Sequence, residues 1–165
     1  MAAGLVLCAL GALHLDCAAA LHGESFVPLG ERAWTRQDLA ELLASPGVTG
    51  LLLRVEGRDA GIALCRVVAD ESELLTIAVR PTDRRRGLGR RLLTAVIDHV
   101  REAGARTLFL EVGADNPPAR ALYEVMGFRV IGTRAAYYRR GDGPPADALI
   151  MRLSLTSCVS VSSDQ

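Results

Sequence analysis

Apolar and polar residues follow two periods along this 165-residue chain, one typical of strands and one typical of helices. Alternation at every second residue predicts β-strands, whereas apolar residues spaced by three or four predict helices that bury one face. The clearest helix is predicted at 87–103, where apolar residues recur every fourth position from Leu88 to Val100 and Gly104 ends the pattern. This segment therefore predicts a long helix packed along one side of a sheet.

The same periods assign the other elements. Strands are predicted near residues 4–10, 50–56, 60–69, 72–79, 107–112, 128–138 and 148–155. The other helices are predicted near 14–25, 36–45 and 117–126, the second of them capped by Thr35. This order predicts a single domain of the mixed α/β (α+β) class over residues 1–155. The serine-rich residues 156–165 are expected to form a disordered tail.

Composition narrows the class of protein. Half of the residues are apolar, and 19 basic side chains balance 19 acidic ones, so neither nucleic acid nor a membrane is expected as a partner. The apolar segment from Ala2 to Leu13 lacks the positive flank of a signal peptide and is better explained by a strand. The four cysteines have no metal-ligand spacing and predict reduced thiols in a cytoplasmic protein without a metal.

The segment from Arg84 to Leu93 joins a predicted strand to the long helix and is rich in arginine and glycine. Unpaired N–H groups at a helix start bind phosphate, and Gly87 and Gly89 allow close approach of the backbone. The spacing fits neither a P-loop nor a dinucleotide fingerprint. It predicts a pyrophosphate cradle, with an ordinary basic loop before a helix as the alternative.

A second segment carries polar residues that could perform chemistry. Glu111 lies within an otherwise apolar strand, where a carboxylate either pairs with a cation or serves in proton transfer. Asn116 before Pro117 predicts a helix start, and Tyr123 follows two turns later. Alternatives remain for both candidates. Glu111 could form an ion pair with Arg129 or Arg134, and Tyr123 could be a core aromatic.

Several motifs occur in order along the chain. They are Glu-x-Glu-Leu-Leu-Thr-Ile-Ala-Val at 71–79, Arg-x-x-Gly-x-Gly at 84–89, Leu-Glu-Val at 110–112, Asn116 with Leu122-Tyr123 and Gly127-Phe128, Tyr137-Tyr138, and Asp147-Ala-Leu-Ile-Met151. Together they resemble the GNAT acetyltransferases, and within that family the ribosomal-protein-alanine N-acetyltransferases of the RimI type. The resemblance covers roughly residues 4–155. It departs from the family pattern at Ala33 and Pro117, which leaves peptide specificity open.

This resemblance implies a mostly antiparallel seven-stranded sheet with about four helices on both faces, and acetyl-CoA as co-substrate. It implies that Glu111 is the general base and Tyr123 the general acid. Tyr137 and Tyr138 would line the entrance for the acceptor. The residues expected to bind the cofactor are Ile77, Ala78, Val79, Arg85, Arg86, Gly87, Leu88, Gly89, Arg90 and Asn116.

The acceptor implied by the resemblance is the N-terminal amine of a protein, a small-subunit ribosomal protein being the usual target of the family. The residues expected on the acceptor side (Trp34, Arg134, Tyr137, Tyr138) include no acidic cluster, which favours a peptide over a cationic antibiotic. Glu71 and Glu73 are an alternative pair of base carboxylates. Lysine side chains or small amines are alternative acceptors, and a non-catalytic acyl-CoA-binding module is the alternative of another class.

Overall fold

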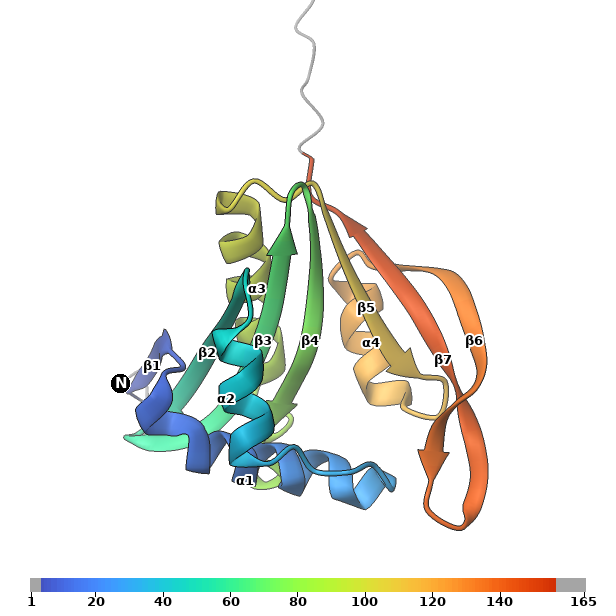
Figure 1. Cartoon of the computed structure of the whole chain (residues 1–165), viewed down its shortest axis with the longest axis horizontal. Helices are drawn as coiled ribbons and strands as arrows, with labels where there is room; N and C mark the ends of the chain where they lie inside the picture. Colours follow the sequence, from blue (N-terminus) through green and yellow to red (C-terminus); the bar gives the residue numbers. More distant parts are fainter. Residues whose placement is uncertain (1–3, 157–165) are drawn as a thin grey trace, which may run out of the picture.

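The computed structural model of the chain describes residues 4–156, and in these residues the sheet and helices predicted from the sequence are present (Figure 1). The strands are β1 (Leu5–Ala9), β2 (Val48–Val55), β3 (Arg58–Val68), β4 (Glu71–Val79), β5 (Thr107–Gly113), β6 (Arg129–Arg140) and β7 (Gly143–Ser154). The α-helices are α1 (Leu15–Phe26), α2 (Arg36–Ala44), α3 (Leu88–Glu102) and α4 (Pro117–Val125), and short 3-10 turns are η1 (Ala12–His14), η2 (Val27–Leu29) and η3 (Pro81–Asp83). Nearly all of the predicted tail, 157–165, lies outside the described residues.

The seven strands form one sheet in the order β1-β2-β3-β4-β5-β7-β6, antiparallel except for the β4–β5 pair. The predicted fold class is thus confirmed. The last hairpin is longer than predicted, since β7 begins at Gly143 and includes Pro144 and Pro145, which lack an N–H donor. They are tolerated because β7 pairs with β5 only from Ala148 onward and has β6 as its single neighbour before that point.

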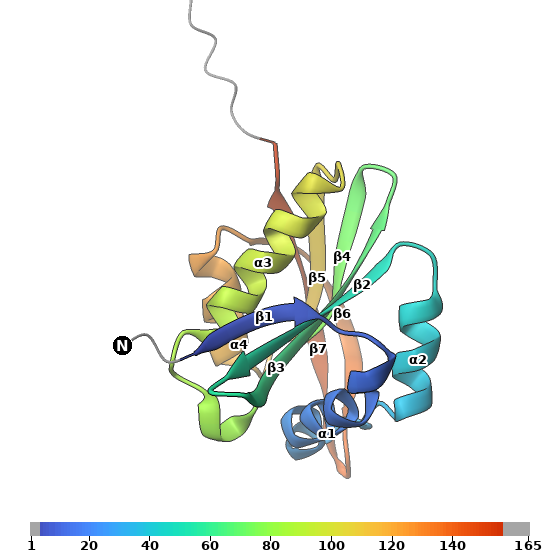
Figure 2. The ribbon, with the colours of Figure 1, turned by 90° about the vertical axis from the view of Figure 1, so that its left-hand side faces the viewer.

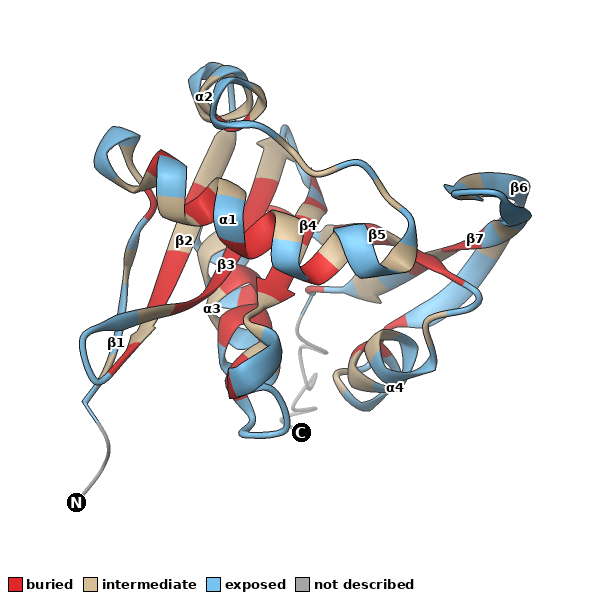
Figure 3. Cartoon of the chain, turned by 90° about the horizontal axis from the view of Figure 1, so that it is seen from below, coloured by how far each residue is buried: buried red, intermediate tan, exposed pale blue. Residues whose placement is uncertain are grey.

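Helices cover both faces of the sheet, with α1 and α2 on one face and α3 and α4 on the other (Figure 2). In Figure 3 the buried residues of α1 and α3 face the strands and their exposed residues face outward. Leu92 and Val96 of α3 are fully buried in a core shared with α4, whereas Leu21 and Leu39 anchor α1 and α2 in a second core. Thr35 caps α2 as predicted, since its side chain accepts a hydrogen bond from the Asp38 amide at 3.1 Å.

The β4–β5 pair is the one parallel pair of the sheet and also its shortest. The two parallel strands pair only where Glu71–Glu73 faces Thr107–Phe109, and beyond these residues they diverge (Figure 1). The divergence coincides with a β-bulge in β4: Leu74 pairs with Cys65 and Thr76 with Leu64, so Leu75 has no partner in β3. A bulge bends its strand and increases the local twist, which turns the end of β4 away from β5. The result is a V-shaped gap in the middle of the sheet.

Candidate functional site: the gap between β4 and β5

The β4 side of the gap presents unpaired backbone groups. The Arg80 amide, directly after β4, donates to the Ala60 carbonyl of β3 at 2.8 Å. This hydrogen bond shows which residues of β4 direct their backbone groups toward β3. Because successive residues of a strand direct their backbone groups to opposite sides, those of Ile77 and Val79 point toward the gap. Ala78 lies between them with its backbone directed to β3 and its side chain buried. Of the three β4 residues expected to bind the cofactor, Ile77 and Val79 therefore direct their backbone groups toward the gap, and Ala78 does not.

The Val79 carbonyl already has side-chain donors. Arg84 Nε donates to it at 3.1 Å, and Ser25 Oγ of α1 lies 3.4 Å away. A ligand in the gap would therefore meet the Val79 amide and both backbone groups of Ile77 more readily than this carbonyl. These donors also fix the end of β4 between α1 and the arginine-rich loop.

The arginine-rich loop leads directly into the start of α3. Gly87 caps the helix in a left-handed conformation (φ 74°), and no side chain caps the first turn. Gly89 faces α4, where a Cβ would lie 3.3 Å from Leu122 Cδ2, so the glycine permits close packing of the two helices. The first turn of α3 therefore has no side-chain cap, and it lies beside Arg85 and Arg90. Uncapped helical N–H groups next to cations can bind phosphate, so the cradle stays a prediction for this loop.

A buried carboxylate supports this loop and was missed in the sequence. Asp83 is 2% exposed, and its Oδ1 accepts from Arg86 Nη1 at 2.8 Å and lies 3.7 Å from Arg58 Nη2. Its Oδ2 has no hydrogen-bond partner among the described residues. Arg86, expected to bind the cofactor, is thereby held against the loop, and Arg58 approaches it from the β2–β3 turn. No local motif marks Arg58 for this position.

Glu111 lies on β5, two residues beyond the last residue paired with β4. As alternation predicted, Phe109 and Glu111 share the α1/α2 face of the sheet, while Leu108 and Leu110 are buried in the core below α3. Glu111 Oε1 lies 3.2 Å from Arg134 Nη2, and their side chains are 24% and 53% exposed. The sequence left Arg129 and Arg134 open as ion-pair partners of Glu111, and in the structure the partner is Arg134.

Glu111 borders a surface hollow of about 340 Å³ on this face. Glu71 and Glu73 of β4 also line it, together with Arg66 and Arg134. Three glutamates therefore lie together beside Arg134, one of the residues expected on the acceptor side. The carboxylates come together because Glu73 pairs directly with β5, a long-range contact that the sequence does not reveal.

Tyr123 of α4 lies on the opposite face of the sheet. It is 5% exposed and meets Phe128 edge to face, with ring centroids 5.8 Å apart. Burial raises the pKa of its phenol well above the usual range, so the hydroxyl keeps its proton at neutral pH. Tyr123 is thus a core aromatic whose hydroxyl stays protonated, and its neighbour Leu122 lies against Gly89 in the first turn of α3.

Asn116 is the N-cap of α4, as predicted, and Pro117 is the first helical residue. Its Oδ1 lies 3.4 Å from the Ala119 amide, and the residue is only partly buried. This cap fixes the helix start beside the end of β5.

Trp34, which was expected on the acceptor side, packs instead on α1. Its ring stacks on His22 with centroids 4.5 Å apart, and its amide donates to His22 Nδ1 at 3.1 Å. Burial, followed by the charge of Arg32, lowers the pKa of His22 to about 4, so its ring is neutral at pH 7. These contacts position the segment that follows α1.

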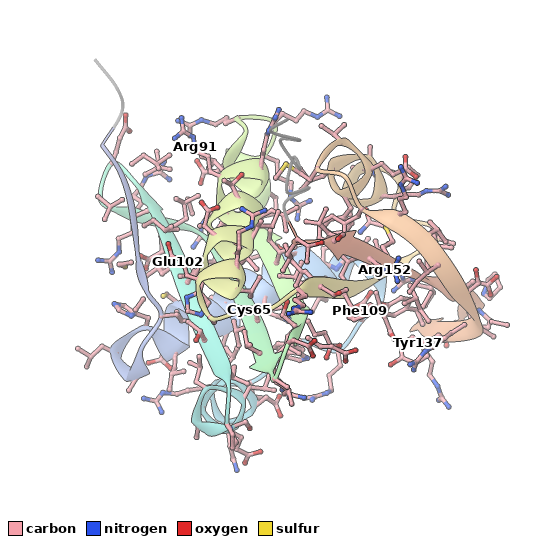
Figure 4. The ribbon with its side chains drawn as sticks, turned by 90° about the horizontal axis from the view of Figure 1, so that it is seen from above. Cys65, Arg91, Glu102, Phe109, Tyr137 and Arg152 are labelled. Carbon is pink, nitrogen blue, oxygen red and sulfur yellow. The ribbon has the colours of Figure 1, made fainter. Side chains whose placement is uncertain are left out.

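The two tyrosines of β6 lie where its pairing with β7 is interrupted between Arg134 and Tyr138. Tyr137 is 49% exposed and projects from the outer strand, as Figure 4 shows, whereas Tyr138 is half-buried. Their rings meet edge to face at 5.2 Å. Burial raises the pKa of Tyr138, and the nearby carboxylates of Glu31 and Glu111 raise it further. Tyr138 is therefore the tyrosine that lies close to Glu111.

Residues 4–156 contain neither a metal-binding cluster nor a membrane-spanning helix. No cluster of three or more His, Cys, Asp or Glu side chains there could hold a metal ion. No helix in this part of the chain is long and apolar enough to cross a membrane.

Comparison with known proteins relates this geometry to characterised enzymes. Residues 15–128 match the model of the acetyltransferase (GNAT) family. The [ribosomal protein bS18]-alanine N-acetyltransferase of Escherichia coli K12 is 45% identical over 104 residues, which are 63% of this chain and 70% of that protein. Its counterpart from Salmonella typhimurium is 45% identical over 106 residues, 64% and 71% of the two chains.

Solved structures agree in fold. The crystal structure of the ribosomal-protein-S18-alanine N-acetyltransferase from Escherichia coli superimposes with a TM-score of 0.84 and 33% identity, covering 95% of this chain and 97% of that one. A Salmonella typhimurium structure that contains its cofactor acetyl-CoA has a TM-score of 0.79 at 18% identity, over 97% and 99% of the two chains. The second likeness concerns the fold alone.

Proposed function

Because the chain belongs to the GNAT family of acetyltransferases and is an acetyl-CoA-dependent N-acetyltransferase, we propose that its acceptor is the N-terminal α-amino group of a protein. The proposed target is the N-terminal alanine of a small-subunit ribosomal protein, on which the similar enzymes named above act. The observation that supports this chemistry is a carboxylate, Glu111, at the hollow beside the diverging strands and a buried phenol, Tyr123, on the opposite face of the sheet.

The cofactor would be held by groups along the gap and at the start of α3. Ile77 and Val79 would pair through backbone groups with the extended pantetheine, as an added strand pairs with a sheet edge. The first N–H groups of α3, with Arg85 and Arg90, would bind the pyrophosphate, and Asn116 would hydrogen-bond the arm from the β5 side. When bound, acetyl-CoA supplies an activated thioester.

Glu111 would act on the acceptor side. An α-ammonium group has a pKa of about 8 and must lose a proton before it can attack. Glu111 would accept that proton, directly or through one water molecule, from an amine bound in the hollow. The amine nitrogen then forms a bond to the thioester carbonyl carbon, and the bond from carbon to sulfur breaks. Binding both reactants in one gap supplies much of the acceleration through proximity.

Tyr123 would act on the other side, where the thiolate leaves. Its phenol is protonated at neutral pH because burial raises its pKa, and the proton passes to the sulfur of the departing CoA. Leu122, the residue before it, packs against Gly89, which places α4 beside the cofactor loop. Base and acid would thus approach the reacting atoms from opposite faces of the sheet.

A second acceptor class is favoured by one observation. Glu71, Glu73 and Glu111 line the same hollow, and three carboxylates could bind a small polycation or a lysine side chain. Arg66 and Arg134 in the same hollow offset much of this negative charge, so a peptide N-terminus remains the first choice.

The test is thiol release from acetyl-CoA with a panel of acceptors. The panel contains peptides beginning with Ala, Ser or Met, an acetyl-blocked Ala peptide with an internal Lys, and spermidine. Transfer to free Ala N-termini supports the proposal. Transfer only to the blocked peptide or only to spermidine would replace it with lysine or polyamine acetylation.

A further inference from the structure

One side chain joins three segments at the open end of the gap. Arg140, at the end of β6, forms ion pairs with Glu31 after η2 (Nη1 to Oε1, 2.6 Å) and with Asp115 between β5 and α4 (Nε to Oδ2, 2.8 Å). Its Nη2 also donates to Asp115 Oδ1 at 2.9 Å, so the guanidinium grips this carboxylate with two nitrogens. The Arg140 side chain is only 11% exposed.

The surrounding backbone is shaped around this contact. A Cβ at Gly30, which has φ 78°, would lie 3.0 Å from Arg140 Cα, so the segment after α1 can approach the β6–β7 hairpin only with glycine here. A Cβ at Gly113 would lie 2.6 Å from Arg140 Nη2. In Figure 1 the end of α1 and this hairpin approach each other at the open end of the gap.

The contact reaches the proposed acceptor site through Tyr138. The Arg140 guanidinium lies over the Tyr138 ring, with Cζ 4.8 Å from the centroid. Tyr138 is close enough to Glu31 and Glu111 that both carboxylates influence its ionisation. The Glu31–Arg140 ion pair therefore extends to the Tyr138 ring, whose ionisation Glu111 also influences.

We propose that Arg140 is a positioning residue for the acceptor: by joining Glu31 and Asp115 it holds the α1–α2 segment, the β5–α4 loop and the β6–β7 hairpin in the arrangement that binds the acceptor amine. Lysine cannot replace it fully, because an ammonium is a point charge and cannot grip one carboxylate with two donors while reaching a second. The inference rests on the proposed function, since it assumes that the acceptor amine binds beside Glu111.

The experiment compares Arg140→Met and Arg140→Lys with the unmodified chain. Arg101→Met is the matched control, because Arg101 forms an exposed ion pair with Asp98 within α3, on the other face of the sheet. Steady-state kinetics give KM for acetyl-CoA and for the best acceptor of the panel above. Amide hydrogen exchange without any ligand gives the opening of residues 27–33 and 139–146.

For Arg140→Met we expect KM for the acceptor to rise about tenfold, the loss of about 1.4 kcal/mol of binding, while KM for acetyl-CoA stays unchanged. Arg140→Lys should be intermediate, and Arg101→Met should match the unmodified chain. Exchange should rise in both segments together.

Unchanged acceptor KM in Arg140→Met, with an active unmodified chain, would overturn the inference. Unchanged exchange in both segments would overturn it as well, whatever the acceptor. Failure of the proposed function has a different signature, which is the absence of transfer to Ala peptides by the unmodified chain.

Discussion

Replacing Glu111 by glutamine separates the two roles that its surroundings allow, a general base and a partner of Arg134. Glutamine keeps the size of the side chain and removes both its charge and its ability to accept a proton. If Glu111 is the base, turnover falls by about 100-fold, within the usual range for lost general-base catalysis. That loss corresponds to about 2.7 kcal/mol in the activation free energy.

If Glu111 serves only as the partner of Arg134, its replacement by glutamine should change stability slightly and leave turnover unchanged. Its nitrogen–oxygen distance is 3.2 Å, but the Arg134 side chain is 53% exposed, so solvent screens the attraction. Pairs of this kind contribute about 0.2–1 kcal/mol to the free energy of unfolding. For a domain of this size that shifts the melting temperature by about 4 °C at most.

The assay measures kcat at saturating acetyl-CoA and acceptor by thiol release, with thermal unfolding in parallel. Arg134→Gln is the matched control, because it breaks the same ion pair and leaves the carboxylate in place. We expect Glu111→Gln to lose activity and Arg134→Gln to retain it, with similar melting temperatures. Equal losses in both variants, or full activity in Glu111→Gln, would refute the assignment of the base.

Four further predictions concern three buried side chains, Tyr123, His22 and Leu92. Tyr123→Phe should lower kcat at saturating acetyl-CoA, and a retained rate would make Tyr123 only a core aromatic. Because burial raises the pKa of Tyr123, its contribution to stability is complete below about pH 10, the unfolded value, and declines at higher pH, as denaturant titration at pH 9 and 11 should show. The pKa of His22 is lowered to about 4, so stability should fall as pH drops from about 6.5 toward 4. The fall should be smaller in His22→Phe, and an equal fall would assign it to other groups. Leu92→Ala should lower the free energy of unfolding by about 2–5 kcal/mol because Leu92 is fully buried, with exposed Arg91→Ala unchanged in the same urea titration.

The helices and strands were largely predictable because their signals are local. The four-residue spacing from Leu88 to Val100 matches the buried face of α3, and the Thr35 and Asn116 caps lie beside the helices they start. The hairpin β6–β7 was predicted too short, since the strand expected from Ala148 begins at Gly143 and contains Pro144 and Pro145. Those prolines are acceptable only because β7 has one neighbour at that point.

The candidate site was predictable in part. The loop from Arg84 to Gly89 joins a strand to a helix, as its spacing predicted, and its role as a phosphate cradle stays a prediction. Glu111 was recognisable as a carboxylate in an apolar strand, but its partner was left open between two arginines. Glu71 and Glu73 were considered as an alternative pair of base carboxylates, but nothing local shows that β4 pairs with β5 and brings them beside Glu111.

The sequence by itself determined which segments become strands and helices, which face of each is apolar, and which loop carries positive charge before a helix. Only the tertiary structure decided where β4 and β5 separate, and which charges meet across the resulting gap. Glu31 and Arg140 are 109 residues apart in the chain, yet their side chains are 2.6 Å apart. The physical reason is that periodicity records burial along one element, whereas a contact between distant residues depends on how the strands pair and twist.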